Sequence, residues 1–352
     1  MRIQQHAVAF AAATFACATL SLMSIRPAAA WWAPGHAVIA MMAYRQMKPA
    51  TRTAIDQILQ QHPDYQNWQA ELPAGVTDAQ KGEYIFAIAS TWPDRIKDSR
   101  DETVSVKFFY PSDKRAPKPY PAAPALYPDL NVHDTWHYQD IPINADGKEH
   151  VLPEEESILT ALPTCRGNAG ATYLPESYRA YYLAWVAHLV GDIHQPLHAT
   201  GRFSAAQPRG DAGGNGVKFT ASGSQPKDLH KYWDSLLGSG PDPVHYNTLK
   251  NYWTELNATI DTITAESPRL LAGFDPATRD NLDEHVWLHE SFSAAQQFVY
   301  TFGDPDATSG SIPQPDDTYH TLAVRIAHQR AALAAHRLAL VCDAIYAGAG
   351  PS

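Results

Sequence analysis

The sequence predicts an all-α fold, organised as one domain over residues 31–352. Apolar residues recur at the 3.6-residue spacing of a helix in most of the chain. Alternation typical of a strand is confined to one short stretch, and the even composition gives no sign of a domain boundary. A chain of this length can bury a sizeable single core.

Residues 1–30 are predicted to form a signal peptide. Arg2 precedes an uncharged apolar stretch, and Ala28 and Ala30 provide an A-x-A cleavage signal. We therefore expect cleavage between Ala30 and Trp31 and a periplasmic or secreted protein. A membrane helix is the alternative for the apolar stretch, whose length is marginal for spanning a bilayer.

Helical periodicity continues to the end of the chain. In the last helical segment, Leu322, Ile326, Leu333 and Leu340 share one face. The segments with this spacing are 35–47, 52–61, 79–90, 176–194, 246–263, 280–302 and 317–346.

Two segments interrupt the helical pattern. Residues 98–136 are rich in proline, which indicates a long surface insertion. Residues 201–226 are rich in Gly and Ser and contain Val217–Thr220, which predicts a short β-hairpin. Neither segment resembles a linker between domains.

Charge and cysteine content restrict the function. Loss of Arg2 and Arg26 with the leader changes the formal net charge from −10 to −12, which argues against simple electrostatic binding of nucleic acid. Cys165 and Cys342 remain after cleavage, an even pair that suggests a disulfide in an exported protein. Two separate buried thiols are the alternative.

Two pairs of His and Asp are spaced for a shared helix face. His188 and Asp192 form the first pair, and His230 and Asp234 form the second. His198 follows a helix-ending proline and can approach the first pair from another direction. Imidazole and carboxylate are ligands that zinc prefers. A single pair of this kind is often a surface hydrogen bond, but their combination favours a metal centre.

Further candidate ligands occur singly. Asp94 and His137 are each flanked by aromatic residues. Cleavage before Trp31 would also create a free amino group five residues from His36. A catalytic zinc site needs ligands from several elements, and these residues could supply them.

The motifs occur in the order found in a known enzyme family. They are Trp-x3-Gly-His at 31–36, Trp-x-Asp at 92–94, His-x3-Asp-x5-His at 188–198 and His-x3-Asp at 230–234. In this combination the chain resembles the S1/P1 nucleases, the zinc nucleases of fungi and plants, which are grouped with zinc-dependent phospholipase C. The resemblance implies a mainly helical fold of that type.

The resemblance also implies three Zn²⁺ ions per chain. Asp192 would bridge two of them, so its loss should disturb both. The implied ligands are Asp94, His137, His188 and Asp192 for the first ion; His198, His230 and Asp234 for the second; and the amine and carbonyl of Trp31, His36 and the other oxygen of Asp192 for the third.

The implied activity is that of a secreted endonuclease. It would hydrolyse single-stranded DNA and RNA to 5′-phosphorylated products and remove the phosphate of 3′-nucleotides. A monomer without stable membrane association is expected. A zinc-dependent phospholipase C is the alternative enzyme, and a non-catalytic zinc-binding protein is the alternative from another class.

Four residues near the implied ligands are candidates for substrate contacts. Tyr138 corresponds to an aromatic that stacks on a base, although core packing would also explain it. Asp140 could accept from the base edge, and Asn215 could contribute from a Gly-rich loop. Lys97 corresponds to a basic residue near the scissile phosphate, with a solvated lysine as the alternative. Lys97 and Asp140 are therefore the expected catalytic side chains beside the metal ligands.

The chain departs from the family pattern between Asp94 and His137. The spacing of 43 positions exceeds the connection expected, so the insertion must loop out and return His137 to the site. His133 is the alternative ligand in this region. His137 is preferred because Trp136 and Tyr138 flank it as in the family motif.

Overall fold

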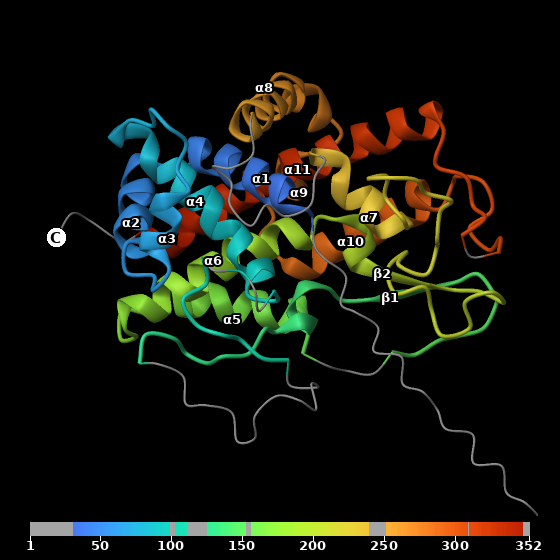
Figure 1. Cartoon of the computed structure of the whole chain (residues 1–352), viewed down its shortest axis with the longest axis horizontal. Helices are drawn as coiled ribbons and strands as arrows, with labels where there is room; N and C mark the ends of the chain where they lie inside the picture. Colours follow the sequence, from blue (N-terminus) through green and yellow to red (C-terminus); the bar gives the residue numbers. More distant parts are fainter. Residues whose placement is uncertain are drawn as a thin grey trace, which may run out of the picture.

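A computed structural model describes residues 31–98, 101, 103–110, 125–152, 156–238, 251–308 and 310–347. Figure 1 shows helices filling most of this volume, with one small sheet near its edge. The mainly helical fold predicted from the sequence is therefore confirmed.

The helices differ widely in length. The α-helices are α1 (Ala33–Gln46), α2 (Pro49–Leu59), α3 (Tyr65–Ala70), α4 (Asp78–Arg95), α5 (Ile158–Gly170), α6 (Glu176–Asp192), α7 (Leu229–Asp234), α8 (Tyr252–Leu270), α9 (Pro276–Arg279), α10 (Glu284–Ala294) and α11 (Asp317–Tyr346). Shorter turns of helix are η1 (Asp134–His137), η2 (Pro196–Ala199), η3 (Ser235–Leu237) and η5 (Ala295–Val299).

Helix α6 lies in the middle of the core. It contacts α1, α2, α4, α5 and α11, and its second half from Leu183 to Asp192 is entirely buried. A helix that is apolar on all sides belongs in the interior of a large fold. The polar side chains that α6 carries near its end are consequently held by surrounding helices.

Most predicted helices agree with the structure, and the differences have local causes. Helix α4 continues through Pro93 to Arg95, beyond the predicted end at residue 90, because Trp92 and Arg95 are buried on either side of the proline. Helix α5 was not predicted from the sequence, because Pro163 interrupts its helical pattern. A capping box formed by Ser157 and Thr160 starts this helix, and packing on α6 stabilises it.

The β-hairpin predicted within residues 201–226 is reduced to one isolated antiparallel bridge between Lys218 and Asp228. The sheet consists of β1 (Ile141–Asn144) and β2 (Thr200–Phe203), which run parallel with Ile141 opposite Thr200. Around residues 217–220, Lys218 forms an isolated bridge with Asp228, and Phe219 forms one with Ile312. The N–H of Phe219 donates to Lys227 O and the N–H of Leu229 to Val217 O, both at 3.0 Å, so the returning chain pairs with this stretch only over one bridge.

The disulfide suggested for Cys165 and Cys342 is not present in this structure. Cys165 lies in α5 and Cys342 in α11, and both are buried free thiols. Burial raises the pKa of each thiol above its ordinary value. Each side chain thus serves as a small apolar group in helix packing, which is the alternative left open by the sequence.

The flanks of the Pro-rich insertion pack onto the core. Phe108 and Tyr127 contact each other edge to face, and both lie against the buried Trp92. The backbone N–H of Phe109 donates to the carbonyl of Leu130 at 2.8 Å. Residues 111–124 and the predicted signal peptide lie outside the described residues. Within the described part of the chain, no helix has the length and apolar character needed to cross a membrane.

Candidate metal centre

Two neighbouring helices bring the first ligand candidates together. His188 and Asp192 project from the same face of α6, with 3.1 Å between His188 Nε2 and Asp192 Oδ2. His36 from α1 stacks on His188, with ring centroids 3.8 Å apart. A Cβ atom at Gly191 would lie 2.9 Å from His36 Nδ1, so glycine at this position lets the two helices approach.

Asp192 faces imidazoles with both of its oxygens. Its Oδ2 lies 2.9 Å from His137 Nδ1, and its Oδ1 lies 3.3 Å from His36 Nε2. His137 Nδ1 is also 2.9 Å from His188 Nε2. Asp94 Oδ1 completes the group at 3.8 Å from His188 Nε2. Asp192 thus has an imidazole next to each of its oxygens, whereas its role as a bridge between two ions remains a prediction.

A second group forms beside the first. His230 and Asp234 project from α7, with 3.4 Å between His230 Nε2 and Asp234 Oδ2. His198 comes from η2, directly after the helix-ending Pro196, and its ring stacks on His230. One ligand atom from each of His198, His230 and Asp234 lies within 4.8 Å of the other two. This arrangement could hold a further metal ion.

Several buried polar atoms of these groups have no hydrogen-bond partner. A buried polar atom without a partner costs stability, so such atoms rarely cluster without a ligand. Nitrogen and carboxylate oxygen atoms together make a donor set that suits zinc. The unpaired atoms in these groups are His36 Nδ1, His36 Nε2, His137 Nε2, Asp192 Oδ1, His198 Nε2 and Asp234 Oδ2.

Backbone carbonyls fix the orientation of three imidazoles. The distance from Nδ1 is 2.8 Å to Ser90 O for His188, 2.8 Å to His137 O for His198 and 2.6 Å to Gly213 O for His230. An Nδ1–H that donates to a carbonyl leaves the Nε2 lone pair free to bind metal. These contacts therefore set the tautomer that a metal ligand needs.

Burial and neighbouring charges prepare the same groups as ligands. Burial and the nearby His188 lower the pKa of His36 to about 4, and burial with Lys97 lowers the pKa of His137 to about 3. Although burial acts in the opposite direction, His188 and His198 hold the pKa of Asp192 well below its usual value. At neutral pH the chain thus presents neutral His36 and His137 beside an ionised Asp192.

The start of the described chain lies against these groups. The Trp31 indole is fully buried and donates to Gly191 O at 3.1 Å, next to Asp192 in sequence. The backbone N–H of Trp32 lies 3.3 Å from Asp234 O. Trp31 is therefore held between α6 and α7, whereas its amine as a ligand remains a prediction.

The structure brings His137 rather than His133 into the centre. His133 Nε2 lies 3.0 Å from Asp129 Oδ1, and its ring stacks on Trp136 at 3.6 Å. His137 ends η1 and is fully buried beside Asp192. The long connection from Asp94 thus returns the chain to the centre at the position preferred from the sequence.

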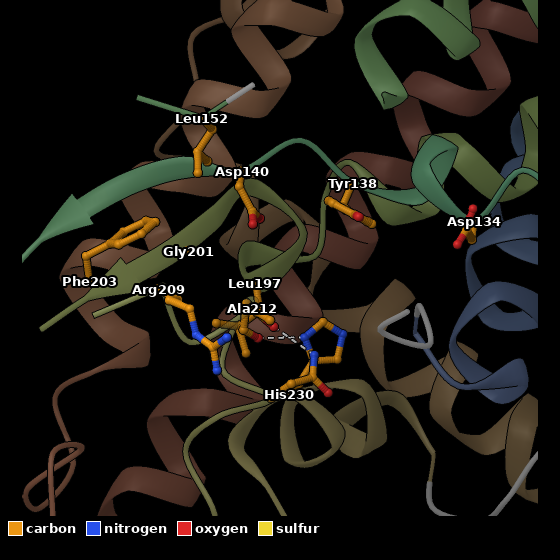
Figure 2. Close-up of a pocket in the computed structure, with 13 residues that line it drawn as sticks. Asp134, Tyr138, Asp140, Leu152, Leu197, Gly201, Phe203, Arg209, Ala212 and His230 are labelled. Carbon is orange, nitrogen blue, oxygen red and sulfur yellow. Dashed lines mark hydrogen bonds between the residues drawn. The ribbon is translucent and has the colours of Figure 1, made fainter. Parts of the chain in front are cut away.

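A pocket of about 190 Å³ opens beside the second group. Tyr138, Asp140 and Asn215 line it together with His230, so three of the predicted substrate residues share one cavity with a metal-ligand candidate (Figure 2). The remaining lining residues are Asp134, Leu152, Leu197, Gly201, Phe203, Arg209, Gly210, Ala212 and Gly213.

The predicted substrate residues differ in how they are held. Burial and the nearby Asp211 raise the pKa of Asp140 to about 7. Asn215 Nδ2 donates to Ala212 O at 2.8 Å, which ties its amide to its own loop. Lys97 lies outside the pocket lining, with its Nζ 2.6 Å from Asp94 Oδ1. Lys97 is thus placed beside the first group and Asp140 beside the second.

Sequence reasoning missed Gln195, which is fully buried between the two groups. Its Nε2 donates to Asp234 Oδ1 at 2.7 Å, and its Oε1 accepts from the N–H of Leu197. Gln195 therefore joins the turn that carries His198 to the ligand candidate on α7. Its place inside the motif that ends at His198 is the signal that could have identified it. Phe203 and Arg209 were missed as well, because no motif contains them.

Helices that bury three converging groups of His and Asp side chains, beside a pocket, define a helical protein with a candidate multinuclear metal centre. The family model described as S1/P1 Nuclease matches residues 31–347, and the chain belongs to this family. The family resemblance predicted from the motifs is thus confirmed.

Two curated relatives show the extent of similarity. Endonuclease 2 of Arabidopsis thaliana is 26% identical over 164 residues, which cover 47% of this chain and 51% of that protein. Nuclease S1 of Aspergillus oryzae is 40% identical over 55 residues, 16% of each chain. The matched part of the chain spans about half the length of the first relative and less of the second.

Proposed function

We propose that this chain is a secreted, zinc-dependent endonuclease that hydrolyses single-stranded DNA and RNA to 5′-phosphorylated products. It also acts as a 3′-nucleotidase. The observation that carries the proposal is the set of unpaired, buried ligand atoms around Asp192 and Asp234, the second of which belongs to the group beside the pocket lined by Tyr138. Membership of the S1/P1 nuclease family supports it and favours it over a phospholipase C.

Three zinc ions fit the donor set. We assign Asp94, His137, His188 and Asp192 to the first ion and His198, His230 and Asp234 to the second. The third would take His36, the other oxygen of Asp192, and the amine and carbonyl of Trp31. Bound zinc would supply a water that is hydroxide near neutral pH and positive charge for the phosphoryl oxygens.

The chain's own residues position the substrate. Tyr138 offers a face on which an unpaired base can stack, and Asp140 meets the base edge deeper in the same pocket. Asn215 lines the pocket beside them. Lys97 places a cation next to Asp94, where it can neutralise charge that develops on the phosphate.

Charge and pocket size favour single strands. The chain has a formal net charge of −10, so it lacks the excess of basic residues needed to neutralise many phosphates of a long duplex. The pocket of about 190 Å³ suits one unpaired base. A single strand, whose bases are free to leave the stack, can place one base in this pocket and does not require a long basic surface.

Export and assembly of the centre are linked in this proposal. Cleavage between Ala30 and Trp31 leaves a single domain of 31–352 and frees the Trp31 amine for the third ion. We expect the active protein to be a monomer in the periplasm or medium. N-terminal sequencing of active protein should return Trp31, and any other first residue would contradict this assignment.

Three substrates test the function. Purified, zinc-loaded protein is assayed on single-stranded DNA, a 3′-nucleotide and a phosphatidylcholine, with and without a chelator. We expect hydrolysis of the first two, loss with chelator and recovery with added zinc. Hydrolysis of the lipid alone would identify a phospholipase C, and binding of zinc without any hydrolysis would identify a non-catalytic protein.

A further inference from the structure

Arg209 lines the pocket but plays no part in the function as proposed above. It is exposed and lies in the turn that follows β2. Gly210, the next residue, has a φ of +81°, and a Cβ atom there would lie 2.9 Å from the ring of Phe203. Only glycine fits this turn without strain. The turn therefore follows the Phe203 ring closely and holds Arg209 at that end of the pocket (Figure 2).

The guanidinium of Arg209 is available to a ligand. Arg202, on β2, donates through both terminal nitrogens to Asp306, at 2.6 and 2.8 Å. No carboxylate of the described residues lies within ion-pair distance of Arg209. The arginine on β2 and the arginine in the turn that follows it thus differ in role. Arg202 stabilises the scaffold, whereas Arg209 presents an unpaired cation to the pocket.

No other Lys or Arg among the described residues lines the pocket. The acidic residues that line it are Asp134 and Asp140. Lys97 forms an ion pair with Asp94, with 2.6 Å between Nζ and Oδ1. In a chain with an overall negative charge, an anion at the Phe203 end of the pocket would therefore depend on Arg209.

The chemistry of guanidinium identifies the anion. Its planar set of donors matches two phosphate oxygens, and such charge-assisted pairs are stronger than neutral hydrogen bonds. In the proposed reaction, the 3′-phosphate of the nucleotide in the pocket lies against the metal-ligand groups. The next phosphate of the strand, on the 5′ side of the same sugar, must then leave in another direction. In Figure 2, Arg209 lies on the Phe203 side, away from Tyr138 and Asp134.

We propose that Arg209 binds the 5′-phosphate of the nucleotide whose base occupies the pocket. This inference rests on the proposed function and adds a subsite to it. Arg209 would then favour nucleotides within a strand over isolated 3′-nucleotides, because only the former carry a phosphate at both positions. It would also contribute a salt-dependent part of the affinity.

Two small substrates isolate this contact. Adenosine 3′-monophosphate lacks the 5′-phosphate, and adenosine 3′,5′-bisphosphate carries it. Their kcat/KM values are compared in the zinc-loaded wild type, Arg209→Gln, Arg209→Lys and the control Arg325→Gln, which removes an exposed arginine on α11. We expect Arg209→Gln to lower kcat/KM about tenfold for the bisphosphate through KM. Its kcat/KM for the monophosphate should stay within about twofold of wild type.

The remaining outcomes decide the proposal. Arg209→Lys should retain part of the preference for the bisphosphate and Arg325→Gln all of it. Equal losses for both substrates in Arg209→Gln, or no loss for either, would overturn the assignment. If the wild type hydrolyses neither nucleotide, the proposed function fails, but calorimetric binding of both still tests Arg209. A tighter Kd for the bisphosphate that Arg209→Gln removes supports the subsite, and equal Kd values contradict it.

Discussion

The metal-ligand groups and the pocket beside them are built in different ways. The groups are buried and sit largely on α1, α4, α6 and α7, where neighbouring helices hold each side chain. The pocket is lined mostly by loops, short helical turns and the strand β2, and Arg209, which lines it, is exposed. We infer that the helices set a fixed reaction centre, whereas the loops determine which substrate reaches it.

The largest expected effect comes from Asp192, the residue proposed to bind two ions. Asp192→Ala should lower hydrolysis of single-stranded DNA and of 3′-nucleotides alike, by roughly 10³-fold or more, because two ions lose a ligand together. Bound zinc should fall as well. The matched control Asp261→Ala, at an exposed position on α8, should retain both activities. Retention of either activity by Asp192→Ala would show that Asp192 is not the bridge.

A smaller effect is expected at the contact that supports the second group. Gln195→Ala removes the hydrogen bond to Asp234 Oδ1 and should weaken zinc binding about 10- to 100-fold. Competition with a chromogenic chelator measures this change, and thermal unfolding in excess zinc checks that the variant folds. Gln296→Ala, at an exposed site, is the control. Unchanged zinc affinity in Gln195→Ala would mean that the contact does not support a ligand.

A substitution in the pocket should lower activity without loss of bound metal. Tyr138→Ala should lower kcat/KM for single-stranded DNA by about tenfold, because one base loses its stacking partner, while zinc content stays at the wild-type value. Tyr138→Phe keeps the ring and should stay close to wild type. Tyr173→Ala, whose side chain is 83% exposed far from the pocket lining, serves as control. A loss of zinc in Tyr138→Ala would contradict the division between centre and pocket.

The smallest effect concerns the pH dependence of stability. The pKa of Asp140 rises from an ordinary 3.8 to about 7, so the fold favours the neutral acid. Its contribution to the free energy of unfolding is present below about pH 4 and is lost as the pH rises to about 7. Asp140→Asn should therefore lose less stability than wild type over this interval. Denaturant unfolding at several pH values measures the free energy of unfolding of each protein, with Asp261→Asn as control. If this free energy depends on pH in the same way in wild type and Asp140→Asn, the raised pKa of Asp140 is contradicted.

The same division explains what the sequence could predict. His188 with Asp192 and His230 with Asp234 are spaced for one helix face, so their proximity follows from helix geometry. The arrival of His137 beside them depended on a family motif, because it lies 43 positions after Asp94. Nothing in the local sequence sets the end point of such a connection.

The errors lie where tertiary contacts override local pattern. Val217–Thr220 alternates like a strand, but its antiparallel pairing with the returning chain is limited to the bridge at Asp228, and a second bridge goes to Ile312. The parallel pairing of β1 and β2 joins segments more than fifty residues apart, which local pattern cannot reveal. Arg209 and Phe203 belong to no motif, so only the folded chain shows that they share a pocket with Tyr138.

Metal analysis tests the central claim most directly. The claim is that the unpaired buried atoms around Asp192 and Asp234, together with the Trp31 amine, bind zinc. Purified, active protein that begins at Trp31 should contain three zinc ions per chain, and stepwise chelation should remove them with the activity on single-stranded DNA. A content of one ion per chain in fully active protein would contradict the account.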